Sequence, residues 1–250
     1  MTLLLLGTVS FVAWFFSMLA AGGSPFILIP LVTVLVGSQA VAPVITTGML
    51  VGNIQRVVFF WRDIDWMLTL WYLPGAIAGA VLGAYVFTQI HLEWLQAVLG
   101  IALLAMVANY WLGKYLKHTQ YRVKIRAWHF LPISFFYAFG SGLVGSMGPV
   151  MNPAYLSYGL VKDKMIATKS LNVAITHVIK LVTYIALGAL TKPFLVYGLV
   201  IGCAAIPANW LGKLVLDRMS NEQFRQVVFA FVGISGIFMI WQQRQFLWLW

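Results

Sequence analysis

Long apolar segments follow one another along almost the whole chain, and polar residues gather in the short connections between them. Of the 250 residues, 62% are hydrophobic and only 9% are charged. A soluble domain of this size needs a largely polar surface, whereas packed transmembrane helices do not. We therefore predict an all-α integral membrane protein of about ten helical segments, two of them short. The expected segments are Leu3–Ala21, Pro25–Val36, Val41–Trp61, Trp66–Phe87, Leu92–Leu112, His129–Gly145, Pro149–Leu160, Met165–Leu190, Phe194–Leu216 and Gln223–Trp241.

Two of these segments, Pro25–Val36 and Pro149–Leu160, are too short to cross a bilayer of ~30 Å unaided. Each begins with proline and follows a glycine-rich break, at Gly22-Gly23 and between Gly145 and Gly148. This pattern is typical of discontinuous helices, whose free N–H groups favour anions. Close helix packing would explain one such break. Two breaks at equivalent places favour a binding site.

The two halves of the chain resemble each other. The corresponding residues are Gly22 and Pro30 with Gly145 and Pro153 at an offset of 123, Asn53 and Arg56 with His177 and Lys180 at 124, and Glu93 with Glu222 at 129. We interpret this as an internal duplication. Residues 1–112 would form the first transmembrane repeat and residues 129–250 the second. Five crossings in each half make the repeats inverted, which places a binding site near the membrane midplane.

The charge of the connections predicts the orientation. Residues 113–128 form a basic connector, which we expect on the cytoplasmic side. If all ten segments cross, the outside keeps only Lys192 and Arg244, and the inside holds Arg62, Lys114, Lys117, Arg122, Lys124, Arg126, Lys162, Lys164, Lys213 and Arg218. If the short segments re-enter instead, the fit to the positive-inside rule is much worse. The net charge of +10 therefore reflects loop charge and predicts no nucleic-acid partner.

Polar residues inside the apolar segments mark the candidate site, because charged groups there need a partner or a wet cavity. In the segment from Ile166 to Leu190, five polar residues recur at helical spacing and predict a polar stripe lining an anion pathway: Lys169, Asn172, Thr176, His177 and Lys180. Arg56 and Lys180 form a matched cation pair suited to an oxyanion. Snorkelling of Arg56 and hydrogen bonding between helices are the alternatives. The expected substrate-binding residues are Gly22, Gly23, Asn53, Arg56, Gly148, Ser170, Asn172, His177 and Lys180.

Acidic residues are few, and all of them lie at segment ends: Asp63, Asp65, Glu93, Asp163, Asp217 and Glu222. This distribution argues against a cation substrate. In proton-coupled transport, His177 or the substrate itself would have to carry the proton. We predict no catalytic residue, metal site or cofactor, since only one histidine lies deep in a segment. An integral-membrane redox or enzyme subunit and a membrane assembly factor remain alternatives, and a homodimer is one option for the oligomeric state.

The residues at the breaks resemble those of the sulfite exporter TauE/SafE family over essentially the whole chain. They are GGSPFILIP with APVITT in the first half, and GSMGPVMNP with ATKSLN in the second. The resemblance implies a multi-pass permease of the bacterial inner membrane that carries sulfite, an organosulfonate or a related small anion. A secondary transporter working by alternating access is the function that we expect.

Overall fold

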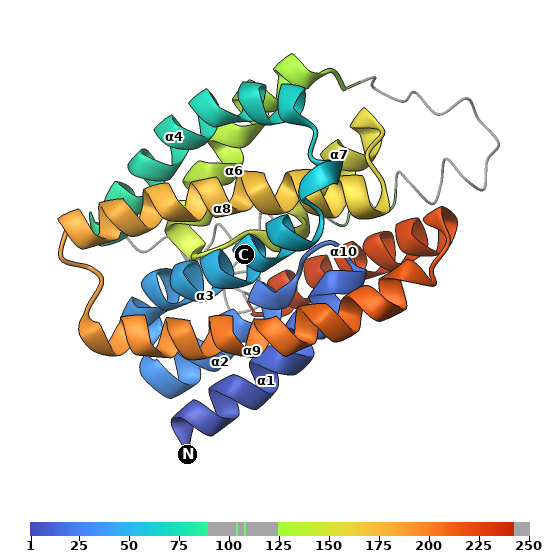
Figure 1. The fold of residues 1–250 in the computed structure, drawn as a ribbon. Coiled ribbons are helices and arrows are strands. Elements are labelled where there is room, and N and C mark those ends of the chain that lie inside the picture. Colours follow the sequence, from blue (N-terminus) through green and yellow to red (C-terminus); the bar gives the residue numbers. More distant parts are fainter. Residues whose placement is uncertain (90–103, 105–107, 109–124, 243–250) are drawn as a thin grey trace.

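The computed structural model describes residues 1–89, 104, 108 and 125–242 (Figure 1). The expected segment Leu92–Leu112 and most of the basic connector at residues 113–128 lie outside this part. The longer helices are α1 (Thr2–Leu19), α2 (Ser24–Val36), α3 (Ser38–Phe59), α4 (Trp66–Gln89), α6 (Phe130–Val144), α8 (Lys162–Ala186), α9 (Lys192–Asp217) and α10 (Asn221–Gln242). The shorter ones are α7 (Asn152–Tyr158) and the 3-10 turns η1 (Trp61–Asp63), η2 (Ala127–His129) and η3 (Gly148–Met151).

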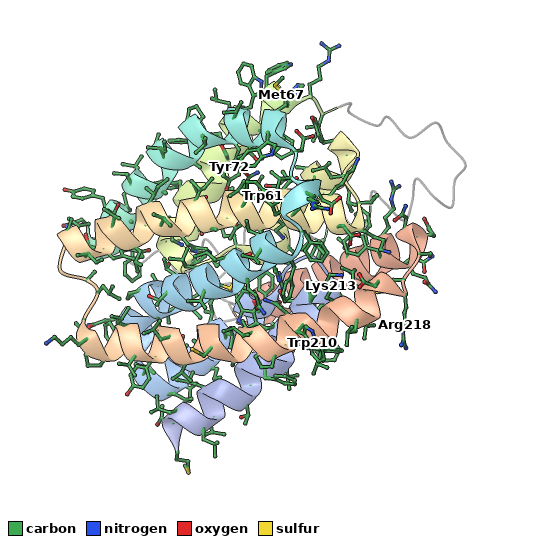
Figure 2. All side chains as sticks on the ribbon, viewed as in Figure 1. Trp61, Met67, Tyr72, Trp210, Lys213 and Arg218 are labelled. Atoms are coloured by element: carbon green, nitrogen blue, oxygen red, sulfur yellow. The ribbon has the colours of Figure 1, made fainter. Side chains whose placement is uncertain are left out.

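Six helical spans of the described part are long and apolar enough to cross a membrane: α1, α3, α4, α8, α9 and the span Ala127–Val144. Large apolar side chains cover the outside of the bundle, as at Met67 and Trp210 (Figure 2). Polar side chains such as Asn152 and Lys180 are fully buried. A polar interior inside an apolar surface is the arrangement of an α-helical membrane protein, because lipid surrounds the bundle.

Two central helices, α3 and α8, pack against each other and organise the bundle. On one side, α9 packs against α3 and α1; on the other, α4 packs against α8 and α6 (Figure 1). Each of these packing pairs has a counterpart when α1 is exchanged with α6, α3 with α8 and α4 with α9. The candidate site lies between α3 and α8, at the centre of this arrangement.

Glycines bring the outer helices close to their neighbours. A Cβ atom at Gly79 of α4 would lie only 2.2 Å from the carbonyl oxygen of Phe135 in α6. A Cβ atom at Gly212 of α9 would lie 2.7 Å from the Cβ of Met18 in α1. Small residues let membrane helices pack backbone against backbone. These contacts hold α6 and α1, the helices that lead into the two breaks.

Both glycine-rich segments interrupt a helix, as expected. After α1, Ala21, Gly22 and Gly23 have φ angles of 50°, 131° and 118°. After α6, Gly145 and Gly148 have φ angles of 88° and 21°. Such left-handed angles end a helix, and glycine adopts them without a steric penalty. The two breaks meet, since a Cβ atom at Gly148 would lie 3.2 Å from the nitrogen of Gly23.

The connections that carry most of the described charge lie at one end of the bundle, where α3 and α9 end and α4 and α8 begin (Figure 1). Lys213 and Arg218 belong to this end, which we call the basic end (Figure 2). Exposed tryptophans lie nearby, including Trp61 and Trp66. The N-terminus lies at the opposite end. Tryptophan and basic residues together are typical of a membrane–water interface.

Candidate functional site

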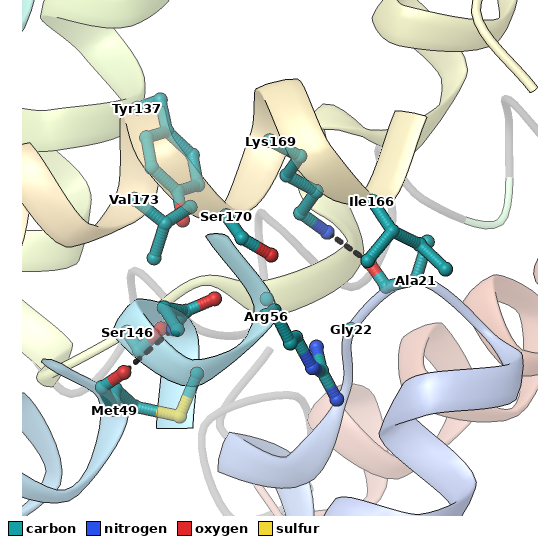
Figure 3. A pocket seen from close by; sticks show the side chains of 12 residues that line it. Ala21, Gly22, Met49, Arg56, Tyr137, Ser146, Ile166, Lys169, Ser170 and Val173 are labelled. Atoms are coloured by element: carbon teal, nitrogen blue, oxygen red, sulfur yellow. Dashed lines mark hydrogen bonds between the residues drawn. The ribbon is translucent and has the colours of Figure 1, made fainter. Parts of the chain in front are cut away.

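A small pocket lies where the two breaks meet α3, α6 and α8 (Figure 3). Its free volume is about 10 Å³, which is roughly the space that one water molecule needs. The lining residues are Ala21, Gly22, Met49, Asn53, Arg56, Tyr137, Ser146, Gly148, Ile166, Lys169, Ser170 and Val173. Residues from both halves of the chain therefore enclose it.

Two basic side chains line this pocket, Arg56 from α3 and Lys169 from α8. Both are almost completely buried, with 3% and 6% of their surface exposed. None of the described residues that line the pocket is acidic. Two like charges repel each other strongly where little water screens them. The pocket is therefore suited to an anion, whose charge would offset this repulsion.

Lys169 joins the two breaks. Its amino group donates hydrogen bonds to the carbonyl oxygen of Ala21 and to Oδ1 of Asn152. The Asn152 side chain in turn donates from Nδ2 to the carbonyl oxygen of Ala20 at 3.1 Å. Figure 3 shows Lys169 reaching from α8 toward Ala21. The second half of the chain thus satisfies carbonyl groups that the end of α1 leaves without partners.

Arg56 is held inside the bundle from two sides. Its Nε donates to Oδ1 of Asn209 in α9 at 2.9 Å, and its Nη2 donates to Oγ of Ser17 in α1 at 3.2 Å. The guanidinium also lies over the ring of Trp14, 4.7 Å from its centroid, at the distance of a cation–π contact. These contacts exclude the alternative in which Arg56 extends to the membrane interface.

Two hydroxyl groups that lie close to each other in the pocket form no well-aligned hydrogen bond, either with each other or with another group. They belong to Tyr137 of α6 and to Ser146 of the second break, and both are buried. Buried polar groups in native proteins are nearly always paired, so unpaired ones at a pocket point to a ligand. Both hydroxyls can donate to an oxyanion. With the two basic side chains, they give the pocket four donors from three different helices and a break.

A family model described as Sulfite exporter TauE/SafE matches residues 6–239. The chain belongs to the sulfite exporter TauE/SafE family. Searches of curated proteins and of solved structures gave no match. The family is one of membrane transporters of the sulfite-exporter type, so this TauE/SafE protein is a multi-pass membrane transporter.

Five of the residues expected from the sequence line the pocket of this TauE/SafE protein: Gly22, Asn53, Arg56, Gly148 and Ser170. Gly22 allows the close approach of Lys169, because a Cβ atom there would lie 2.6 Å from Nζ of Lys169 and would displace the amino group. Asn53 donates from Nδ2 to the carbonyl oxygen of Met49, within its own helix, at 2.7 Å. The glycines thus allow close approach, while Asn53 and Ser170 add neutral polar groups.

The other four expected residues, Gly23, Asn172, His177 and Lys180, do not line the pocket. Gly23 packs beneath α10, where its Cβ would overlap the ring of Phe231. Asn172 donates to the hydroxyl of Tyr155 in α7 at 2.9 Å. His177 is fully buried, and neither ring nitrogen has a hydrogen-bond partner.

Lys180 is placed at the end of α6. Its amino group donates to the carbonyl oxygen and the hydroxyl of Ser141, at 2.9 and 3.0 Å, and to the carbonyl oxygen of Gly145. Three hydrogen bonds use all the donors of an ammonium group. The structure therefore brings Arg56 together with Lys169 at the pocket, and not with Lys180. Eleven residues of helix separate Lys169 from Lys180, roughly 16 Å along the axis.

The polar stripe expected on α8 is divided among several neighbours. Thr176 contacts the hydroxyl of Tyr72 in α4 at 2.9 Å, while Asn172 contacts α7 and Lys180 contacts α6. The helix is buried on many sides, and successive residues turn by about 100° around it. Residues three or four apart share a face but lie about 5 Å apart along the axis, so each level of the stripe meets a different neighbouring helix.

Sequence reasoning left three polar pocket residues out of the expected site: Lys169, Tyr137 and Ser146. Lys169 belongs to the polar stripe and Ser146 lies inside the second break, so the sequence patterns pointed to the position of both residues. Tyr137 is one aromatic residue among several in an apolar helix, and no pattern in the sequence separates it from them.

Proposed function

We propose that this TauE/SafE transporter binds a small oxyanion, such as sulfite, an organosulfonate or a related sulfur oxyanion, between its two helix breaks. The observation that carries the proposal is the pairing of Arg56 and Lys169 in a buried pocket without acidic lining residues. Guanidinium and ammonium groups form strong, charge-assisted hydrogen bonds to oxyanions. The hydroxyls of Tyr137 and Ser146 would replace part of the hydration shell of the anion.

Transport would proceed by alternating access. An oxyanion of several heavy atoms needs more room than the roughly one-water volume of the pocket, so the pocket must widen to admit it. The bonds from Lys169 to Ala21 and from Asn152 to Ala20 cross between the two halves. Opening would break these bonds, and a bound anion would compete for the amino group of Lys169. The reciprocal packing of the helices supports two inverted repeats, residues 1–112 and 129–250, that rock against each other.

The basic end would face the cytoplasm, with the connector at residues 113–128 on the same side. Basic residues accumulate in cytoplasmic loops, and the basic end holds Arg62, Lys162 and Arg218. The opposite end carries Lys192. We place the protein in the cell inner membrane, in keeping with the sulfite-exporter family.

The test is uptake of radiolabelled sulfite, thiosulfate and an alkyl sulfonate into proteoliposomes that contain the wild type or Lys169→Gln. One charged hydrogen bond contributes about 1.5–3 kcal/mol, so we expect the initial rate at limiting anion concentration to fall at least ~tenfold. The matched control is Lys213→Gln. Lys213 is partly exposed at the basic end and pairs with Asp217 at 2.7 Å. Its removal should change the rate less than ~twofold.

Equal rates for the wild type and Lys169→Gln would remove the pocket from the transport mechanism. A wild-type protein that moves none of the three anions above the level of empty liposomes would refute the proposed substrate class. A thermal-shift panel of the same anions adds an independent measurement, because a bound ligand stabilises the folded state by mass action.

A further inference from the structure

His177 is a buried titratable side chain that does not line the pocket. It is fully enclosed in α8, and neither Nδ1 nor Nε2 has a hydrogen-bond partner. The basic side chains Arg56, Lys169 and Lys180, in contrast, all donate to protein oxygens. A neutral imidazole always carries one donor and one acceptor. Both are left unsatisfied here, which is rare for a buried group without a function.

The position of His177 links it to the pocket. It lies four residues, or about one helical turn, after the pocket residue Val173. On the neighbouring helix, Thr46 precedes the pocket residue Met49 by three residues, and its buried hydroxyl lies close to the hydroxyl of Tyr184. Because α8 runs away from the basic end and α3 runs toward it, both residues lie one turn beyond the pocket in the same direction. Buried polar groups thus continue from the pocket toward the end opposite the basic end.

The charges around His177 are positive or absent. Lys180, three residues on, is the charged group that acts on it directly. The helices around α8 carry the buried titratable residues Arg56 in α3, Tyr72 in α4, Tyr137 in α6 and Tyr155 in α7, and α8 itself carries Lys169 and Tyr184. The carboxylates of the described part lie at helix ends and in η1, namely Asp63, Asp65, Asp163, Asp217 and Glu222. A proton on His177 therefore has no carboxylate to balance it inside the described part of the bundle.

We propose that His177 binds the proton of a proton-coupled transport cycle, and that it does so together with the anion. A bound anion supplies the negative charge that the surroundings of His177 lack, so that anion and proton each favour the binding of the other. The proton adds to the lone pair of an imidazole nitrogen and leaves by the same bond, so no other reactant is needed. This inference rests on the proposed function, because it requires an anion in the neighbouring pocket.

The experiment uses proteoliposomes with a pH-sensitive dye inside and sulfate as the anion, because sulfate keeps its charge between about pH 5 and 8, where histidine titrates. Two readouts are recorded: anion counterflow, which needs no net charge movement, and proton movement in step with net anion uptake. We expect His177→Gln to retain counterflow and to lose proton movement per anion by at least ~tenfold. The matched control is His129→Gln in η2, at the basic end, which should behave as the wild type.

A second measurement covers the case in which His177→Gln folds poorly. If one proton binds together with each anion, the sulfate affinity of the wild type should rise by up to ~tenfold for each unit that the pH falls. Wild-type affinity that does not change with pH, or wild-type sulfate uptake without protons, would overturn the inference. Normal proton movement in His177→Gln would overturn it as well. Absence of wild-type counterflow for sulfate and for the three anions of the uptake test would instead overturn the proposed function, and this inference with it.

Discussion

The amino group of Lys180 donates a hydrogen bond of 3.0 Å to the hydroxyl of Ser141. In the first half of the chain, Arg56 donates to the hydroxyl of Ser17 at 3.2 Å. Arg56 and Lys180 are 124 residues apart in the sequence, and Ser17 and Ser141 are separated by the same number. The same offset for both members of the contact supports an internal duplication, because a tertiary contact has been repeated along with its residues.

Each of these cations lies at the end of a helix that leads into a break. Ser17 is in the last turn of α1, and Ser141 is in the last turn of α6. The last carbonyl groups of a helix lack partners and carry the negative end of the helix dipole. A buried cation donates to these carbonyl groups and offsets the negative end of the dipole, so Arg56 and Lys180 stabilise the two interrupted helices. Arg56 also reaches the pocket, whereas Lys180 does not.

Lys180→Met should therefore reduce stability more than substrate affinity. The substitution leaves the carbonyl oxygens of Ser141 and Gly145 buried without a donor, at about 1–3 kcal/mol each. We expect the free energy of unfolding in detergent to fall by about 2 kcal/mol or more, with anion affinity of the folded fraction changed less than ~twofold. Chemical denaturation and equilibrium binding measure the two effects. A large loss of affinity at unchanged stability would instead make Lys180 a substrate ligand.

Tyr137→Phe and Tyr184→Phe should have opposite effects. The hydroxyl of Tyr137 forms no well-aligned hydrogen bond within the protein, so its removal should leave stability unchanged or raise it slightly. Anion affinity should fall about fivefold to tenfold, because the variant loses one neutral hydrogen bond to the anion. The hydroxyl of Tyr184 donates to the carbonyl oxygen of Gly142 at 2.7 Å, so Tyr184→Phe should lose stability and keep its affinity. Similar profiles for both variants would contradict a ligand-binding role of Tyr137.

Gly22→Ala should abolish transport, while Gly37→Ala should not. Both glycines have left-handed φ angles, 131° and 107°, so both substitutions strain the backbone by about 1–2 kcal/mol. At Gly22, the new methyl group would lie 2.6 Å from Nζ of Lys169, whereas no atom lies within 4 Å of the Cβ position at Gly37. The difference in uptake rate between the two variants isolates crowding of the pocket from backbone strain. Equal rates would show that backbone strain alone limits transport.

Gly79→Ala should separate α4 from α6, because its Cβ would lie 2.2 Å from the carbonyl oxygen of Phe135. Overpacking of a tight contact typically destabilises by about 1–3 kcal/mol. Gly7→Ala in α1 is the control, since its nearest neighbour would be Val200 at 3.8 Å. That variant should gain up to about 1 kcal/mol from the higher helix propensity of alanine. Melting temperatures in detergent measure both effects. Changes in melting temperature of the same sign for the two variants would contradict the close packing of α4 and α6.

Several features were predictable because they depend on local chemistry. Apolar segments of sufficient length predict helices that span a membrane, and Pro25 with Gly22 and Gly23 predicts where α1 is interrupted and α2 begins. The scarcity of buried carboxylates and the presence of buried basic residues predict an anion-binding interior. These properties belong to the residues themselves and do not require knowledge of their neighbours.

Only the tertiary structure decided which basic residues share the pocket. Lys169 and Lys180 both lie on α8 with helical spacing, and sequence repetition favoured Lys180 as the partner of Arg56. Spacing fixes the angle of a side chain around its own helix, but the neighbouring helix determines what that side chain meets. At Lys169 the neighbour is the break after α1, and at Lys180 it is the end of α6. The apolar pattern therefore fixed the class of the protein, and the packing of α8 against its neighbours fixed the site.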